Sequence, residues 1–357
     1  MKELALKDLG FDQHLEEYRS ENQLEAFEVG RVSLEHKERY VIKTPTNELE
    51  AELIGNLRFT AESRYDFPAV GDWVAYSEYD SDKALIHAIY PRTSIIERKA
   101  VGKAGQTQII ATNVDYGLIV QAVDRDFSIN RLERYLTICY SYKVSPIIVL
   151  SKTDLINESE LDSFNALIRQ RIKEVPVVAV SNQTNGYNSL ESIIEAGKTY
   201  CLLGSSGVGK STIVNSLSGE NQMKTGEISA SANRGKHITS HRELIILDNG
   251  GILIDNPGMR EVGIADTSEG LETTFETILE YAKDCRFSDC THEHERGCAV
   301  LAAIEHGEID EDSYLNFLKM LKEKRHYEMD AQERKKKDKD LGKMIKNVLK
   351  EKKKNKF

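Results

Sequence analysis

A glycine-rich segment with one lysine and two hydroxyl residues after it has the composition of a phosphate-binding loop. It follows the apolar run 200–203 and precedes the helix-compatible run 212–217. Glycines let the backbone turn its N–H groups toward a phosphate at the amino end of a helix. A glycine turn without a ligand is the alternative, and the preceding strand argues against it. The predicted loop comprises Gly204, Ser205, Ser206, Gly207, Val208, Gly209, Lys210, Ser211 and Thr212.

Within this loop, we expect Lys210 to reach the β- and γ-phosphates and the Ser211 hydroxyl to bind Mg²⁺. Downstream, Asp255 ends an apolar run and begins the sequence Asp-Asn-Pro-Gly. Its carboxylate could hold Mg²⁺ through water, and the N–H of Gly258 could contact the γ-phosphate. Thr239, which lies between the loop and Asp255, is the candidate second Mg²⁺ ligand.

The group that orients the attacking water is harder to assign. Ras-like GTPases place a glutamine after the glycine that contacts the γ-phosphate, and this chain has Met259 there. Slow intrinsic turnover is therefore expected. We take His237, close to Thr239, as the candidate catalytic residue. A structural or RNA-contacting role for His237 is the alternative.

A second motif predicts that the base is guanine. Residues Ser151, Lys152, Thr153 and Asp154 follow the apolar run 147–150. A carboxylate in such a loop accepts hydrogen bonds from N1–H and the exocyclic amine of guanine, a donor pair that adenine lacks. Ser181 and Asn182, after the run 177–180, form the expected second base-contacting loop. Because the base-reading motif precedes the phosphate loop, the reverse of the usual order, the domain is predicted to be circularly permuted.

Three cysteines and a histidine form a compact group late in the chain. Cys285, Cys290, His292 and Cys298 supply three thiolates and an imidazole, a complete set for tetrahedral Zn²⁺, with His294 as a competing fourth ligand. With no open coordination position, one structural zinc per chain is expected. Reduced cysteines without metal are the alternative.

The elements that position these motifs change character along the chain. Residues 1–26 suggest a short amphipathic helix, and 27–100 contain five short strand-like runs typical of an OB-like β-barrel. From 101 to 275, apolar β-branched runs alternate with helical stretches, which predicts a mostly parallel α/β domain, with an antiparallel hairpin at Asn249-Gly250. Residues 276–357 are expected to form a helical zinc-binding domain with a basic tail.

Charge is distributed unevenly in this chain of 357 residues. The net charge of −10 comprises a basic segment, Lys322–Phe357, and a strongly acidic remainder. The basic tail could contact nucleic acid locally, or it could be a solvated terminal helix. No apolar run is long enough to cross a bilayer, and the first ten residues do not resemble a secretory signal. We therefore expect a cytoplasmic protein without membrane contacts.

The motifs together resemble the ribosome-small-subunit-dependent GTPase A (RsgA) family of circularly permuted GTPases. The resemblance extends from about residue 30 to residue 300. Besides the permuted GTPase motifs and the cysteines, it rests on three runs: Gly71-Asp-Trp-Val74, Ala111-Thr-Asn-Val-Asp115 and Phe127-Ser-Ile-Asn-Arg-Leu-Glu-Arg-Tyr135. In the base-reading motif, Ser151 stands where the family has Asn or Thr.

The resemblance implies an OB-fold, a permuted GTPase domain, a zinc domain and His292 as the fourth zinc ligand. It further implies binding to the small (30S) ribosomal subunit and its rRNA during late maturation, with hydrolysis of GTP to GDP that the subunit stimulates. We expect the protein to be a monomer. The competing hypothesis is an RNA-binding switch that holds nucleotide with negligible turnover, or that has a non-ribosomal RNA partner.

Overall fold

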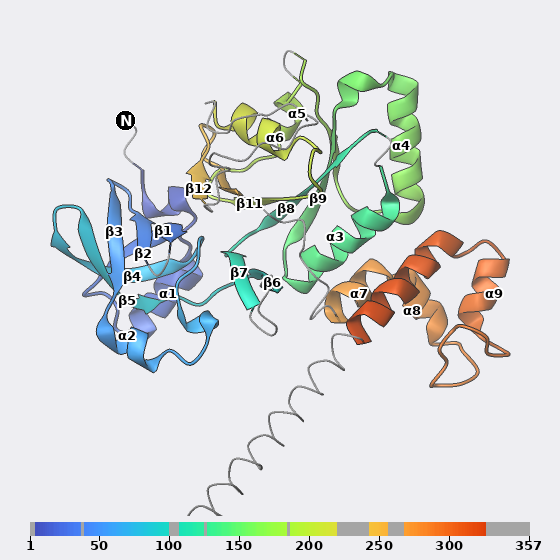
Figure 1. Ribbon diagram of the computed structural model, residues 1–357, viewed down its shortest axis with the longest axis horizontal. Coiled ribbons are helices and arrows are strands. Elements are labelled where there is room, and N and C mark those ends of the chain that lie inside the picture. The colour runs from blue at the N-terminus through green and yellow to red at the C-terminus, as the bar shows by residue number, and fades with distance from the viewer. Residues whose placement is uncertain are drawn as a thin grey trace, which may run out of the picture. The chain divides into compact units, whose positions relative to one another are not determined.

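The computed structural model describes residues 4–36, 39–99, 107–124, 127–183, 186–219, 243–255 and 268–325 of the chain. The chain divides into two compact units, Met1–Gly263 and Ile264–Phe357. The first unit contains the barrel and the α/β domain, and the second contains the cysteine group (Figure 1). No helix in the described ranges is long and apolar enough to cross a membrane.

The amino-terminal segment differs from the single helix that the sequence suggested. It forms a short 3₁₀ helix, η1 (Leu6–Leu9), followed by α1 (Gln13–Glu21). Gly10 separates them in the left-handed region with φ of 90°, a conformation that a continuous helix cannot contain. Asp12 then caps α1 by accepting a hydrogen bond from the N–H of Leu15. The expected helix is therefore wrong as one element.

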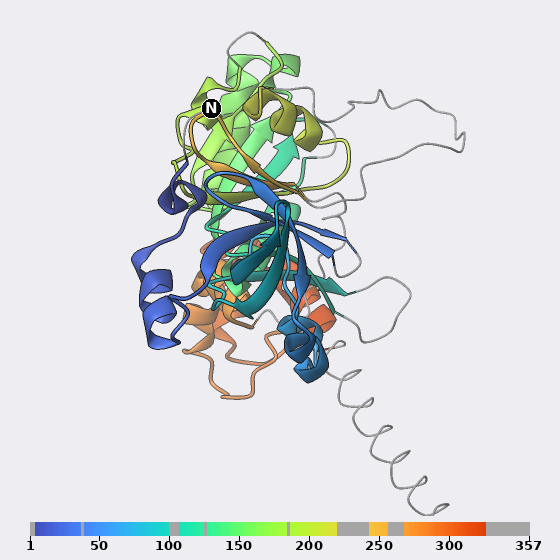
Figure 2. The same ribbon diagram turned by 90° about the vertical axis from the view of Figure 1, so that its left-hand side faces the viewer.

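The predicted barrel is closed by five strands in an OB-like order. Strand β1 pairs antiparallel with both β2 and β4, β3 pairs with β2 and β5, and β4 pairs with β5. Alternating residues of these strands fill its interior. Figure 2 shows the barrel strands from their own side. Its elements are β1 (Glu28–His36), β2 (Arg39–Lys43), β3 (Glu48–Leu53), α2 (Gly55–Thr60), η2 (Arg64–Asp66), β4 (Trp73–Asp80) and β5 (Lys83–Ile89).

A two-stranded hairpin of β6 (Ile95–Lys99) and β7 (Thr107–Thr112) links the barrel to the α/β domain. The α/β sheet has the order β10-β9-β8-β11-β13-β12, parallel except for β12 at the edge. The predicted permuted α/β fold and its antiparallel hairpin are thus present. Its strands are β8 (Tyr116–Ala122), β9 (Ser145–Ser151), β10 (Val177–Ala179), β11 (Thr199–Leu203), β12 (Glu243–Ile246) and β13 (Ile252–Asp255).

Helices cover both faces of this sheet (Figure 1). α3 (Ile129–Ser141) and α4 (Glu158–Arg171) pack on one face, and α5 (Asn188–Glu191) and α6 (Lys210–Leu217) pack on the other. Alternate strand residues belong to the apolar cores on the two faces of the sheet: Ile119 packs in the core with α3, whereas Leu118 packs in the core with α6. A short 3₁₀ turn, η3 (Thr153–Leu155), follows β9. Burial on both faces explains why the strands read as continuous apolar runs.

The barrel and the α/β sheet are joined by backbone pairing between one strand of each. Strand β1 pairs with β12 at Leu34 and Glu243, so that one continuous sheet runs from β10 to the barrel. The second unit has its own core and consists of helices: α7 (Ser268–Thr274), α8 (Glu276–Ala282), α9 (Ala299–Glu305) and the helical residues 311–325.

Candidate functional site

The predicted phosphate loop lies between the end of β11 and the start of α6. Gly204 has φ of 148°, and a Cβ there would lie 2.4 Å from the carbonyl oxygen of Val120 on β8. Gly209 forms the amino-terminal cap of α6 with φ of 94°. The Lys210 ammonium donates hydrogen bonds to the carbonyls of Gly204 (2.7 Å) and Ser205 (2.6 Å). The loop is therefore curled around its own lysine, with Ser211 in the first turn of α6.

The base-reading motif is attached directly to the phosphate loop. Ser151, at the end of β9, is only 3% exposed, and its hydroxyl donates a 2.6 Å hydrogen bond to the carbonyl of Val208. Serine thus supplies the donor that links the two loops, a role that an amide or threonine could also fill. The sequence alone did not reveal this contact, because Ser151 and Val208 are far apart along the chain.

The remaining motif residues lie around Asp154. The backbone N–H of Asn182 donates to its carboxylate at 3.1 Å, so the two predicted base-contacting loops meet. Lys152 adopts φ of 60° and pairs with Asp124 at 3.1 Å. The hydroxyl of Thr153 donates to the Val180 carbonyl, which fixes the loop against the end of the neighbouring strand.

Three residues to which the sequence analysis gave no role in the site also lie at this edge of the sheet; one of them, Arg131, belongs to the run Phe127–Tyr135. Asp124 follows β8 and holds Lys152. Tyr187 donates its hydroxyl to the side-chain oxygen of Asn182 at 2.7 Å. Burial and the nearby Asp154 carboxylate raise the pKa of Tyr187. On α3, Arg131 lies 3.3 Å from the Ser205 hydroxyl. The sequence could have indicated Asp124 as a site residue, because it follows the apolar run that forms β8 and so lies at the carboxyl end of a strand.

The Mg²⁺ and switch residues are only partly covered by the structure. Asp255 ends β13, which runs parallel to β11, so its carboxylate lies at the same sheet edge as the phosphate loop. His237, Thr239 and Gly258 lie outside the described residues.

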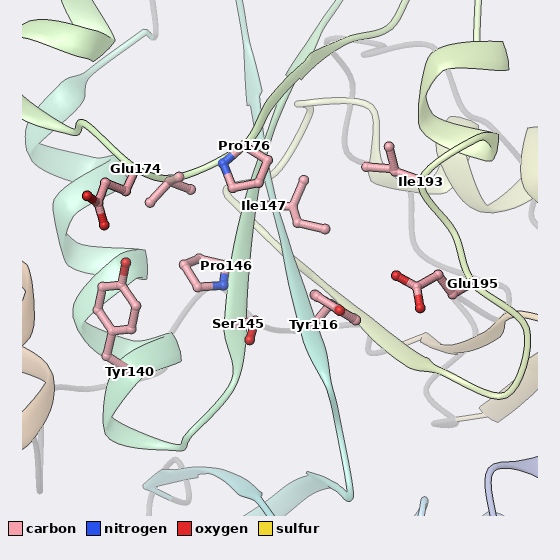
Figure 3. A pocket seen from close by; sticks show the side chains of 10 residues that line it. Tyr116, Tyr140, Ser145, Pro146, Ile147, Glu174, Pro176, Ile193 and Glu195 are labelled. Atoms are coloured by element: carbon pink, nitrogen blue, oxygen red, sulfur yellow. The ribbon is translucent and has the colours of Figure 1, made fainter.

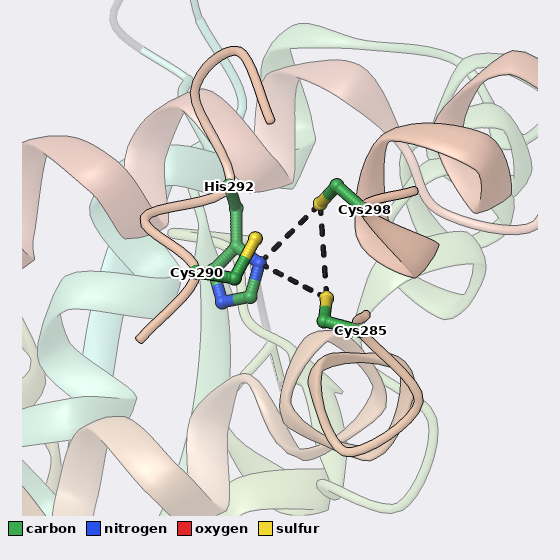
Figure 4. A group of neighbouring side chains, drawn as sticks. All are labelled: Cys285, Cys290, His292 and Cys298. Atoms are coloured by element: carbon green, nitrogen blue, oxygen red, sulfur yellow. Dashed lines mark hydrogen bonds between the residues drawn. The ribbon is translucent and has the colours of Figure 1, made fainter. Parts of the chain in front are cut away.

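The cysteine group has the spacing of a tetrahedral metal site. Ligand atoms of Cys285, Cys290, His292 and Cys298 all lie within 4.8 Å of one another, and His294 is not among them (Figure 4). The Sγ atoms of Cys285 and Cys298 are 3.8 Å apart, and Nδ1 of His292 lies 3.5 and 3.4 Å from them. A Zn²⁺ tetrahedron with its usual bond lengths has edges of about 3.8 Å between sulfurs and about 3.6 Å between sulfur and nitrogen.

Neighbouring backbone groups hold these ligands in place. Cys298 caps α9 and accepts from the N–H of Leu301, while Tyr314 donates its hydroxyl to the carbonyl of His292. Burial by itself would raise the pKa of Cys285, but N–H groups at the start of α9 and the adjacent thiols outweigh it and lower that pKa. Burial also lowers the pKa of His292, favouring the neutral imidazole that a metal requires.

The other two cysteines and a cavity at the opposite edge of the sheet lie away from these sites. Burial raises the pKa of both Cys139 and Cys201, as expected for inert thiols in an apolar core. A cavity of about 380 Å³ is lined by Tyr116, Ser145, Pro176 and their neighbours (Figure 3). These residues lie near the amino ends of β8, β9 and β10, at the sheet edge opposite the phosphate loop.

Comparison with known proteins places these features in one family. The RsgA GTPase family model matches residues 89–265. A Small ribosomal subunit biogenesis GTPase RsgA 1 from Bacteroides thetaiotaomicron is 37% identical over 325 residues, covering 90% of both chains. A Small ribosomal subunit biogenesis GTPase RsgA 2 from Listeria monocytogenes is 43% identical over 300 residues, covering 82% of this chain and 83% of the relative.

Solved structures show the same fold. YjeQ from Thermotoga maritima matches with a TM-score of 0.62 and 25% identity, covering 83% of this chain and 97% of YjeQ. YloQ, a circularly permuted GTPase, matches with a TM-score of 0.60 and 24% identity, covering 84% of this chain and 96% of YloQ. The order of the motifs, their convergence at one sheet edge and the similarity over most of the sequence agree: the chain belongs to the RsgA family of circularly permuted GTPases.

Proposed function

We propose that this protein is a GTPase that binds the small (30S) ribosomal subunit, assists its late maturation, and hydrolyses GTP to GDP and phosphate when the subunit stimulates it. The observation that carries the nucleotide part is the hydrogen bond from Ser151 to the Val208 carbonyl, because it joins the base-reading loop to the phosphate loop. The ribosomal part is supported by relatives named as small-subunit biogenesis GTPases.

In this proposal, the loop 204–212 wraps the phosphates with its N–H groups, and Lys210 exchanges its present carbonyl acceptors for the β- and γ-phosphates. Asp154 accepts from guanine N1–H and the exocyclic amine, while Lys152 lies along the ring and residues 181–182 close over the base. Asn182 already contacts Asp154, so the carboxylate is oriented before the base arrives.

Magnesium fits the oxygen donors at this edge. Ser211 begins α6 and Asp255 ends the adjacent strand, and hard oxygen ligands suit Mg²⁺. Thr239 is the proposed second protein ligand, and bound Mg²⁺ would neutralise charge on the β- and γ-phosphates. His237 is the proposed residue that orients the attacking water, and Gly258 the one that senses the γ-phosphate.

Zinc fits the second site because three thiolates and one imidazole already have tetrahedral spacing. Its proposed role is structural, bracing the helices of the second unit.

We assign residues 1–26 to an amino-terminal extension, 27–100 to the barrel, 101–275 to the GTPase domain and 276–357 to the zinc-binding domain with its basic tail. Loss of γ-phosphate contacts would reorient the zinc domain on rRNA and favour release. The protein is proposed to act as a cytoplasmic monomer.

A second candidate function is a nucleotide-dependent RNA-binding switch with negligible turnover. Met259 favours it, because methionine cannot orient water as glutamine does. Phosphate release from GTP and ATP, with and without purified small subunits, separates the two candidates. GTP-selective release that the subunit stimulates and that Lys210→Ala abolishes supports the GTPase. Tight GTP binding without stimulated release supports the switch.

A further inference from the structure

A buried arginine joins the barrel to the strand that carries the phosphate loop. Arg31, on β1 of the barrel, is 1% exposed. Its guanidinium donates to the carbonyls of Leu9 (2.7 Å), Gly71 (3.1 Å) and Asn113 (3.1 Å), and to the hydroxyl of Thr199 (2.9 Å). One side chain thus binds the amino-terminal segment, the barrel, the segment leading into β8 and the first residue of β11.

The charge of Arg31 is expensive to bury, and among the described residues no carboxylate bonds to it directly. Burial lowers its pKa to about 10, although Asp115 and Asp72 oppose that shift from nearby. Both carboxylates are held by other groups: Arg92 pairs with Asp72, and Lys198 pairs with Asp115. Buried polar groups at a boundary are one way to specify a single docking arrangement. The acceptors of Arg31 are correctly placed only while the barrel and sheet remain docked.

Both strands that meet at this junction end at the nucleotide site. Strand β11 begins at Thr199 and runs into the phosphate loop at Gly204, while β8 begins just after Asp115 and leads to Asp124. The two strands are parallel neighbours, and Asp115 also accepts from the N–H of Thr199. Strand β11 has five residues and, at a rise of about 3.3 Å per residue, is about 16 Å long. A shift of Thr199 at its start would therefore move the phosphate loop at its end.

A partly open pocket also borders the junction. A cavity of about 320 Å³ is lined by Arg31, Asn113, Lys198, Thr199 and nearby polar residues. Side chains beside such a cavity can change position without repacking an apolar core. By contrast, the interiors on either face of the sheet are filled with apolar side chains. The contact between Arg31 and Thr199 is therefore the adjustable part of the connection.

From this arrangement we propose that Arg31 is a positioning residue: through Thr199, it conveys the docking of the barrel on RNA to the phosphate loop. The inference rests on the proposed function, because it assumes that the small subunit stimulates GTP hydrolysis. Arg31 does not touch the nucleotide and acts only by setting where β11 begins relative to the barrel. Weakening the contact between Arg31 and Thr199 should reduce the stimulation of GTP hydrolysis by the small subunit without reducing nucleotide binding.

The test uses the full-length protein and Thr199→Val, which removes the hydroxyl acceptor but keeps the shape of the side chain. Thr137→Val is the matched control: Thr137 is also fully buried, and its hydroxyl donates a hydrogen bond to the carbonyl of Glu133 within α3. Phosphate release is measured with and without small subunits. For Thr199→Val we expect stimulation to fall about five- to tenfold, with basal rate and KM for GTP unchanged, in the range of allosteric coupling.

Thr199→Ser, which retains the hydroxyl, should restore stimulation, whereas Thr137→Val should leave it at the wild-type level. Equal stimulation in Thr199→Val and wild type would overturn the inference, as would an equal loss in Thr137→Val. If Thr199→Val does not fold, Arg31→Lys decides the question, because lysine keeps the charge but cannot reach four acceptors at once. An absence of stimulation in the wild type would instead refute the proposed function itself.

Discussion

The cysteine group and the nucleotide site are built in opposite ways. The four proposed zinc ligands come from 14 consecutive residues and already lie at metal-ligand spacing. The nucleotide site collects its residues from the ends of β8, β9, β11 and β13, with long stretches of chain between them. We therefore expect the cysteine group to need its metal for stability. The nucleotide site is held in place by the sheet, so its nucleotide is needed for the reaction and not for folding.

Removing a zinc ligand should have the largest effect on the structure. Cys298→Ala takes away a thiolate that also caps α9, and structural zinc contributes about 10 kcal/mol or more to the folding of small domains. We expect loss of bound zinc and of protease resistance in the second unit, with GTP affinity preserved. Zinc content and limited proteolysis measure this. Cys139→Ala, which removes a buried thiol from α3, should keep its zinc. A zinc-free Cys298→Ala with wild-type protease resistance would contradict the prediction.

Lys210→Ala should give the largest effect on the reaction. The substitution removes the charge expected at the β- and γ-phosphates, and removing one such stabilising group typically costs about a hundredfold or more in rate. We expect kcat/KM for GTP to fall at least that far while zinc content is unchanged. Lys173→Ala, at an exposed lysine beyond the end of α4, is the matched control and should behave as wild type. A loss of less than about tenfold would argue against the assigned role.

Asp154→Asn tests base selection separately from phosphate binding. The amide cannot accept two hydrogen bonds from guanine, so GTP affinity should fall about a hundredfold, equivalent to one or two charge-assisted bonds. Xanthosine triphosphate, which has a carbonyl where guanine has its amine, should bind better to the variant than to the wild type. Titration with both nucleotides measures the change. An unchanged preference for GTP would show that the base is selected elsewhere.

Different parts of the molecule were predictable for different physical reasons. The barrel strands, the alternating α/β pattern and the cluster of three cysteines and a histidine are encoded over short stretches, where periodicity and spacing suffice. The amino-terminal segment was mispredicted because its apolar residues fit a helical period, whereas Gly10 breaks the helix. The Ser151–Val208 bond and the contacts of Arg31 link residues far apart in sequence, so no local pattern could reveal them.

The smallest predicted effect concerns the link between the two nucleotide loops. Ser151→Ala removes one buried hydrogen bond to Val208, worth about 1 kcal/mol, which should weaken GTP binding about fivefold. Ser151→Thr keeps the hydroxyl and should bind GTP within about twofold of wild type. Equilibrium binding of a fluorescent GTP analogue resolves both changes. If Ser151→Ala binds as tightly as wild type, the loops do not depend on this bond.

The pairing of β12 with β1 bears on how the protein can be dissected. Strand β12 is the last strand of the α/β sheet, and its outer side meets the barrel at Leu34 and Glu243. Unpaired strand edges recruit strands from other molecules and cause aggregation. The barrel therefore also shields this edge from self-association. A truncated protein beginning at β8 would expose it, and its low activity could reflect aggregation and not the loss of RNA contacts.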